Sequence, residues 1–273
     1  VAMLHTPTHA TGDDLVLTYF SDNKGRNELS RLIFAIGNVD YVNEEIDHGA
    51  YLTRRGNGEL PYDQIPTLRV GSFVIGQSCA IARFAARKAG LYPKDEMQAA
   101  IADAVVDQWR DQLDLFYDTV FAREIIGGKL MMFPRKAAER QPKLSSYIEV
   151  AYKPTLAQYE RQLTVQTDGA PHFSTEGLSF ADVAVYDLIK TLATAIEEAP
   201  YKAILEPYPK LQALVRSLDA RPEIVEHLEK HPYKSIHQFF KPPSAAVTCG
   251  QTCLWPCLKM LMGLMARHKS KNR

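Results

Sequence analysis

The spacing of apolar residues changes along the chain from strand-like runs to helical repeats. The run Leu15–Phe20 has the composition of a strand, and apolar residues then recur at helical spacing from Leu29 to Ile36, until Gly37 ends the pattern. The elements predicted after this helix are, in chain order, a strand at 41–46, a polar loop through Gly56 and Gly58, strands at 67–70 and 73–75, and a helix at 78–89.

The order of these elements predicts the topology of a small α/β domain. A strand, a helix and a second strand form a right-handed parallel crossover, and two short strands joined at Gly71 and Ser72 form an antiparallel hairpin. This spacing is typical of a thioredoxin-like fold. We therefore predict a thioredoxin-like N-terminal domain over residues 15–92, preceded by a flexible arm at 1–14.

From residue 93 onward only helical spacing recurs. A long amphipathic helix is defined by Ile101, Val105, Trp109, Leu113, Phe116 and Val120. Further helices are predicted at 144–166, 179–196, 207–218 and 222–230, and Ser179 and Asp182 have the spacing of a capping box. The sequence thus predicts an all-α C-terminal domain over residues 93–240 and a separate tail over 241–273.

Composition and charge narrow the function classes. With 32 basic and 32 acidic residues the chain has a formal net charge of zero, which argues against nucleic acid as a partner. The neutrality hides a division, because residues 241–273 contain six Lys or Arg and no acid, whereas residues 1–240 contain 26 basic and 32 acidic side chains. The four cysteines and the lack of a signal-peptide pattern predict a reducing, cytoplasmic setting.

The turn after the first strand bears on thiol chemistry. Thioredoxin-like folds often place reactive cysteines there, but here the turn reads Ser21-Asp22-Asn23-Lys24. The chain is therefore predicted not to be a dithiol oxidoreductase, and any reactive thiol must come from a ligand. Tyr19 has a phenol that can donate a hydrogen bond to such a ligand, although an interior aromatic of the sheet is the alternative.

Four motifs carry a resemblance to a known family. They are Leu17-Thr18-Tyr19-Phe20, Gly25-Arg26-Asn27-Glu28 followed by Arg31, Gln64-Ile65-Pro66, and the run from Gln77-Ser78 to Phe84. In this order and spacing the chain resembles a cytosolic glutathione S-transferase over about residues 15–235. The sigma class, which includes the glutathione-dependent prostaglandin D synthases, is the most similar. The resemblance implies a homodimer, a role in detoxification, apolar electrophilic substrates, and glutathione as co-substrate without a metal.

The resemblance also implies the catalytic residues. Tyr19 matches the tyrosine whose hydroxyl bonds the glutathione sulfur and favours its thiolate, and Arg26 matches an arginine placed near that tyrosine. A free thiol with a pKa near 8.5 is only about 3% ionised at pH 7, and lowering that pKa by about two units requires about 2.7 kcal/mol. One hydrogen bond to a charged acceptor contributes roughly 1.5–3 kcal/mol, so a phenol with a nearby cation is sufficient.

The same resemblance implies the glutathione-binding positions. Ser78 is predicted as the N-cap of a helix, and the resemblance implies that Gln77 and Ser78 bind the γ-glutamyl carboxylate at that helix N-terminus. Pro66 matches a cis-proline that presents the backbone of Ile65, next to Gln64, to the cysteinyl part of glutathione. By itself, an X-Pro bond is expected to be trans.

Further polar positions are assigned with alternatives. Tyr51 and Arg55 match residues that contact the glycyl carboxylate, but Arg54 and Arg55 equally fit a solvated loop. Asp111 matches an acid that reaches glutathione in the partner subunit, with Asp107 as the second choice. An exposed helix carboxylate is the alternative for Asp111.

The sequence leaves the substrate open. The electrophile pocket is expected near Tyr117 and Phe121, where periodicity gives no chemical identity. Glutathione-dependent isomerisation, as in prostaglandin D synthases, and a non-catalytic ligand-binding or scaffold role are therefore alternatives to conjugation. The histidines His172, His227 and His231 are predicted to be surface residues and not metal ligands.

The tail departs from the family. Cys249, Cys253 and Cys257 precede an apolar run and the basic cluster from Arg267 to Arg273. This composition is typical of an acylated or interfacial anchor, which would bring the protein to a membrane surface through residues 249–273. A disordered or dimer-packing extension is the alternative, and a zinc site is disfavoured because only His268 could be a fourth ligand.

Overall fold

The computed structural model describes residues 15–21, 24–126, 129–165, 169–196 and 198–233. Within this part the chain forms two compact units, one from residues up to Leu113 together with Pro154–Tyr233, and one from Asp114–Lys153. The predicted arm at 1–14, the tail at 241–273 and its cysteines lie outside the described residues. The domain boundary near residue 92 stays a prediction, because the first unit contains the N-terminal sheet and most of the helices.

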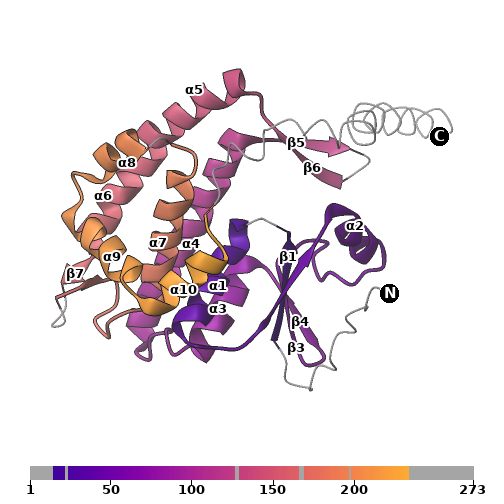
Figure 1. Ribbon diagram of the computed structural model, residues 1–273, viewed down its shortest axis with the longest axis horizontal. Coiled ribbons are helices and arrows are strands. Elements are labelled where there is room, and N and C mark those ends of the chain that lie inside the picture. The colour runs from indigo at the N-terminus through magenta and orange to yellow at the C-terminus, as the bar shows by residue number, and fades with distance from the viewer. Residues whose placement is uncertain (1–14, 22–23, 127–128, 166–168, 197, 234–273) are drawn as a thin grey trace. The chain divides into compact units, whose positions relative to one another are not determined.

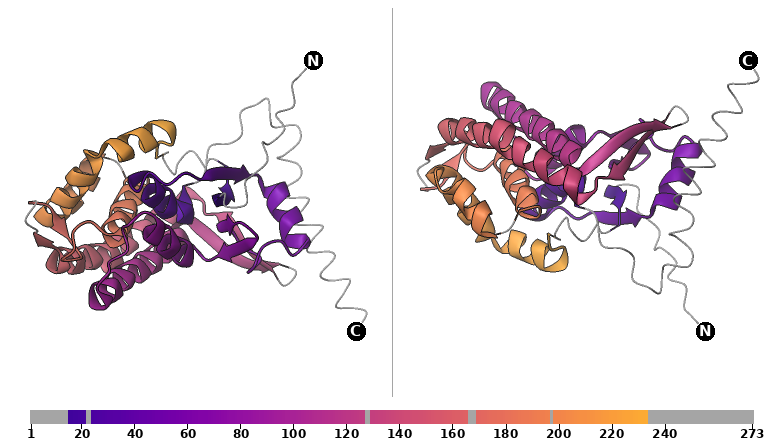
Figure 2. Two further views of the ribbon diagram at one scale, coloured as in Figure 1. Left: turned by 90° about the horizontal axis from the view of Figure 1, so that it is seen from below. Right: turned by 90° about the horizontal axis from the view of Figure 1, so that it is seen from above.

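The first unit contains a four-stranded mixed sheet in the order β2-β1-β3-β4. Its strands are β1 (Leu15–Phe20), β2 (Val42–Ile46), β3 (Thr67–Val70) and β4 (Phe73–Gly76). As the sequence predicts, β1 and β2 are parallel, and β3 and β4 form an antiparallel hairpin beside β1. Helices α1 (Glu28–Ile36) and α3 (Ser78–Lys88) lie on one side of the sheet and α2 (His48–Gly56) on the other (Figures 1 and 2).

The strand register brings several chain segments to one end of this sheet. Thr18 of β1 pairs with Thr67 of β3, and Thr67 pairs with Gly76 of β4. The residues that follow Thr18, precede Thr67 and follow Gly76 therefore lie at the same end. On the other side of β1, Phe20 pairs with Ile46, the last residue of β2, so α2 also starts at this end.

Helix α1 is buried on nearly all sides. Its apolar residues Leu29, Leu32 and Ile33 have no exposed surface, and the helix packs against α3, α7 and α10. At its end, Gly37 lies so close to Ala89 that an added Cβ would stand 2.3 Å from the Ala89 Cβ. The glycine that the sequence identifies as a helix stop is thus also required by the packing of α1 on α3.

The helical part is built around α7. Its helices are α4 (Glu96–Val120), α6 (Lys153–Gln162), α7 (Phe180–Ala193), α8 (Glu198–Leu205), α9 (Pro209–Asp219) and α10 (Pro222–Lys230). The predicted capping box is confirmed, because the side chains of Ser179 and Asp182 each accept the other's backbone N–H. The described part of the chain thus has the predicted fold class, a thioredoxin-like region and a helical C-terminal region.

The second unit contains an element that the sequence does not predict. Strands β5 (Phe121–Ile126) and β6 (Lys129–Pro134) pair in antiparallel register directly after α4. They are followed by α5 (Ala137–Tyr147) and a π-helical turn at Ile148–Tyr152, so the helix expected at 144–166 is interrupted. A short apolar run does not by itself distinguish strand from helix, which explains the miss.

Three smaller expectations also fail. The polar loop predicted after β2 contains α2, a helix with no buried residue. The sequence also misses α8 and the two-residue strands β7 (Thr164–Val165) and β8 (Pro171–His172). The prediction of surface histidines is wrong for His172 and His227, which are only 4% and 7% exposed.

None of the helices in the described ranges is long and apolar enough to cross a membrane.

Candidate functional site

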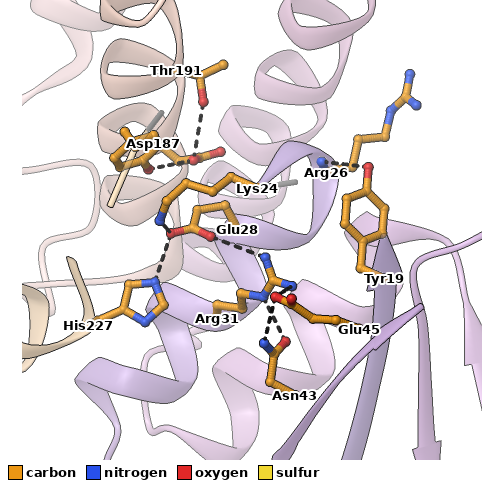
Figure 3. Close-up of polar contacts among 11 residues, drawn as sticks. Tyr19, Lys24, Arg26, Glu28, Arg31, Asn43, Glu45, Asp187, Thr191 and His227 are labelled. Atoms are coloured by element: carbon orange, nitrogen blue, oxygen red, sulfur yellow. Dashed lines mark hydrogen bonds and ion pairs between the residues drawn. The ribbon is translucent and has the colours of Figure 1, made fainter. Parts of the chain in front are cut away.

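Tyr19 stands at the end of the sheet where the segments meet. It is the fifth residue of β1 and is 6% exposed, so the interior position considered from sequence is correct. Its hydroxyl accepts a hydrogen bond from the backbone N–H of Arg26 at 3.4 Å (Figure 3). Within the described ranges the hydroxyl donates its own proton to no acceptor. Tyr19 is therefore a buried aromatic residue whose hydroxyl can still donate a hydrogen bond to a ligand.

The electrostatics around Tyr19 keep its phenol protonated. Burial raises the pKa of the Tyr19 hydroxyl above its ordinary value, while the positive charges of Arg26, Arg31 and Arg110 oppose that rise. A protonated phenol donates a hydrogen bond, and nearby guanidinium groups favour an anion at the acceptor. Sequence reasoning identified Arg26 but not Arg110 of α4, because no local pattern marks a residue about 90 positions away as a neighbour of Tyr19.

Arg26 lies in a short 3-10 turn, Gly25–Asn27, between β1 and α1. Its backbone N–H points at Tyr19, whereas its side chain extends away from the hydroxyl (Figure 3). The resemblance implies a guanidinium beside the tyrosine, whereas in the structure the direct contact comes from the main chain of Arg26. A substitution of Arg26 would thus remove charge but leave the N–H donor in place.

The peptide bond between Ile65 and Pro66 is cis, as the resemblance implies. The general preference of X-Pro bonds for the trans form would have predicted the opposite. Pro66 directly precedes β3 and is buried, Ile65 is half-buried and Gln64 is exposed. The register of β1 and β3 brings Pro66 next to Tyr19. The backbone of Ile65 is therefore available at the same end of the sheet as the Tyr19 hydroxyl.

Gln77 and Ser78 begin α3 at this end of the sheet. The N-cap is Gln77, with φ at 71°, and its side chain caps no N–H of the helix, so the prediction of Ser78 as N-cap is wrong by one residue. Ser78 is the first helical residue and is 5% exposed. Because no side chain caps the first turn, its N–H groups and the Ser78 hydroxyl suit a carboxylate.

Helix α2 carries Tyr51 and Arg55 on one face. The Tyr51 hydroxyl donates to the carbonyl oxygen of Asp63 at 3.0 Å, and Arg55 approaches both that hydroxyl and the Asp63 carboxylate. The neighbouring Arg54 makes a two-pronged ion pair with Glu44 of β2 at 2.7 and 2.8 Å. The solvated-loop alternative is therefore wrong, because both arginines are engaged on a helix.

The two aspartates considered on α4 differ in environment. Asp107 is paired with Arg83 of α3 at 2.7 Å, and Arg83 also binds Asp103 at 2.7 Å. Asp111 is exposed and makes no hydrogen bond or ion pair with any described residue. Asp111 is thus the better placed of the two for an outside partner, and its contact with a partner subunit's glutathione stays a prediction.

Tyr117 and Phe121, predicted near the electrophile pocket, belong to the second unit. Their ring centroids are 6.2 Å apart, and Phe116 next to Tyr117 packs against Tyr147. The pocket itself stays a prediction. No group of three or more His, Cys, Asp or Glu side chains within the described ranges could hold a metal ion.

Comparison with known proteins agrees with this arrangement. Residues 128–231 match the family model for the glutathione S-transferase C-terminal domain. S-crystallin 2 of Enteroctopus dofleini is 28% identical over 222 residues, which are 80% of this chain and 94% of that protein. Hematopoietic prostaglandin D synthase of Gallus gallus is 28% identical over 225 residues, which are 81% of this chain and 98% of that protein.

Among solved structures, rat hPGDS complexed with a quinoline aligns with a TM-score of 0.65 at 23% identity, covering 82% of this chain and 100% of that one. The fold is therefore that of the glutathione S-transferases. With the match over 128–231 and the relatives above, the chain is similar to sigma-like glutathione S-transferases, as its N-terminal motifs indicate.

Proposed function

We propose that this chain is a glutathione transferase in which the Tyr19 hydroxyl holds the glutathione sulfur as a thiolate for attack on an apolar electrophile. The observation that carries the proposal is the buried Tyr19 hydroxyl, which accepts from Arg26 and donates to no described residue. A thiolate beside Tyr19 would accept a hydrogen bond from this hydroxyl, and such a bond to a charged acceptor is stronger than a neutral one. Arg26 and Arg110 contribute positive charge that favours the anion.

The remaining contacts follow from the same end of the sheet. In the proposal, Ser78 and the first N–H groups of α3, with Gln77, bind the γ-glutamyl carboxylate, and the backbone at Gln64 and Ile65, turned by Pro66, pairs with the cysteinyl unit. Tyr51 and Arg55 bind the glycyl carboxylate, for which Arg55 would exchange its contact with Asp63. Asp111 reaches glutathione of the partner subunit in a cytoplasmic homodimer.

The decisive experiment measures conjugation of glutathione to an activated aryl halide by the wild type and by Tyr19→Phe. The substitution keeps the ring and removes one hydrogen bond to a charged acceptor, worth about 1.5–3 kcal/mol, so kcat/KM should fall roughly 10- to 150-fold. The thiol of bound glutathione, followed by the ultraviolet absorbance of the thiolate, should show a raised pKa in the variant.

Tyr92→Phe is the matched control. It also removes one phenol hydroxyl, which donates a hydrogen bond of 2.9 Å to Asp103. Because this hydroxyl does not belong to the proposed glutathione site, the substitution should leave the pKa of the glutathione thiol unchanged. A wild type that binds no glutathione, or whose rate does not depend on Tyr19, would overturn the proposal.

Two other functions use the same groups, and each has a distinct readout. An isomerase would use the thiolate and regenerate it, so product would form while the glutathione concentration stays constant; the similarity to a prostaglandin D synthase favours testing this. A ligand-binding or scaffold protein would bind glutathione or apolar compounds with no turnover. Conjugation consumes one glutathione per product, which separates it from both.

A further inference from the structure

A buried cluster of charged groups lies behind the turn that carries Arg26. Glu28, the first residue of α1, has no exposed surface, and its carboxylate contacts Lys24 and the Nε2 of His227, the latter at 2.8 Å (Figure 3). Arg31 approaches the other carboxylate oxygen at 3.6 Å. His227 comes from α10, 199 residues further along the chain. The cluster therefore joins the start of α1 to the last described helix.

A second buried acid, Asp187 of α7, lies beside this cluster. Asp187 is fully buried and accepts hydrogen bonds from Trp109 Nε1 at 3.1 Å and from the Tyr233 hydroxyl at 2.9 Å. The Lys24 ammonium lies over the Tyr233 ring, 4.3 Å from its centroid. Lys24 thus stands between α1 and the residues that follow α10.

The charge state of Glu28 follows from these partners. Burial alone would raise the pKa of its carboxyl, but the contacts with His227 and Lys24 outweigh burial and lower it to about 2. Glu28 is therefore a carboxylate at neutral pH, and the His227 Nε2 must carry a proton and donate it. Removing either partner would leave a buried charge short of compensation, which proteins tolerate poorly.

The position of the ion pair in the sequence gives it a further consequence. Lys24 and Glu28 flank the 3-10 turn Gly25–Asn27, so their ion pair connects the two ends of the turn that includes Arg26. The backbone N–H of Arg26 is the group that contacts the Tyr19 hydroxyl. A shift of the turn by a few tenths of an ångström would lengthen this already long hydrogen bond beyond its useful range.

We propose that Glu28, Lys24 and His227 are positioning residues that hold the turn carrying Arg26 against Tyr19, so that the seating of α10 sets the geometry of the Tyr19 hydroxyl. None of the three touches the reacting sulfur in this scheme. Its functional consequence rests on the proposed glutathione activation by Tyr19, whereas its structural part does not.

The structural part is tested by ¹⁹F NMR of protein labelled with 3-fluorotyrosine, in which Tyr19→Phe assigns the Tyr19 resonance. His227→Ala should shift that resonance, and His227→Gln, which restores an N–H donor, should return it toward the wild-type position. Lys24→Ala, which breaks the ion pair with Glu28 from the Lys24 side, applies the same test if His227→Ala does not fold. Lys230→Ala, which breaks an exposed ion pair on the same helix, is the control and should leave the resonance in place.

Kinetics test the functional part. His227→Ala should lower kcat by about 3- to 10-fold, the range for losing one neutral hydrogen bond, and leave KM for glutathione nearly unchanged, with recovery in His227→Gln. A folded His227→Ala or Lys24→Ala variant with an unmoved Tyr19 resonance overturns the inference, whatever the enzyme activity. A moved resonance in a protein without Tyr19-dependent conjugation upholds the positioning and rejects the proposed function.

Discussion

The aspartate of the capping box allows the sharpest prediction of stability. Asp182 has no exposed surface. One carboxylate oxygen accepts the backbone N–H and the hydroxyl of Ser179 at 2.7 and 3.0 Å, and the other accepts the N–H of Phe173 at 3.0 Å. Asp182 thus caps α7 and also ties the segment around Phe173 to it. The substitution Asp182→Ala removes all three hydrogen bonds at once.

The magnitude follows from what the substitution leaves behind. Loss of a helix cap costs about 1 kcal/mol, and each buried N–H left without an acceptor costs about 1–3 kcal/mol. With the N–H groups of Phe173 and Ser179 both affected, we expect a loss of about 3–5 kcal/mol in the free energy of unfolding. Because whole proteins of this kind are stable by about 5–15 kcal/mol, this is a large fraction of the total.

Urea unfolding followed by circular dichroism measures this loss, provided that the slope with denaturant stays equal to that of the wild type. Asp182→Asn keeps the side-chain volume and one acceptor oxygen, so the free energy of unfolding should fall by about half as much as in Asp182→Ala. Glu226→Ala, on the exposed face of α10, should change the free energy of unfolding by less than about 0.5 kcal/mol. A loss below about 1 kcal/mol in Asp182→Ala, with an unchanged slope, would refute the reasoning.

Two further predictions concern the buried acid on α7 and the contact between α1 and α3. Burial and the charge of Glu28 raise the pKa of Asp187 to about 7, so the folded state keeps a proton that the unfolded state releases, and stability should fall as pH rises from about 4 to 7. Asp187→Asn should flatten this dependence of stability on pH, as measured by thermal melts at a series of pH values. Parallel curves of stability against pH for the wild type and the variant would contradict the prediction. Glu28, whose pKa is about 2, affects stability only at lower pH. Gly37→Ala should cost about 1–3 kcal/mol because its Cβ would stand 2.6 Å from the Ala89 Cα, whereas Gly56→Ala, with nothing within 4 Å, should be neutral or stabilising in the same urea assay.

Local sequence patterns were sufficient to predict the helices and strands whose buried residues recur at regular spacing along the chain. The apolar stripe of α1, the long repeat of α4 and the capping box of α7 all appear in the sequence, because each follows from residues three or four positions apart. The motifs around Tyr19, Pro66 and Gln77 are also visible in the sequence. Their convergence at one end of the sheet follows from the predicted strand order.

Tertiary structure decided the features that depend on residues far apart in the chain. Helix α2 has no buried residue, so Asp47 at its N-cap and the ion pair of Arg54 with Glu44 matter more than an apolar stripe. The direct contact of Arg26 with Tyr19 comes from a main-chain N–H, which side-chain identity does not reveal.

The burial of Glu28 and His227 is the clearest case. Each, taken alone, reads as a surface residue, because an isolated charge is costly to bury. Only when α10 packs against α1 do the two meet at 2.8 Å, and the partner makes burial of the carboxylate tolerable. The sequence by itself determined where helices and strands form from near neighbours, whereas the folded chain decided which polar groups compensate one another across about 200 residues.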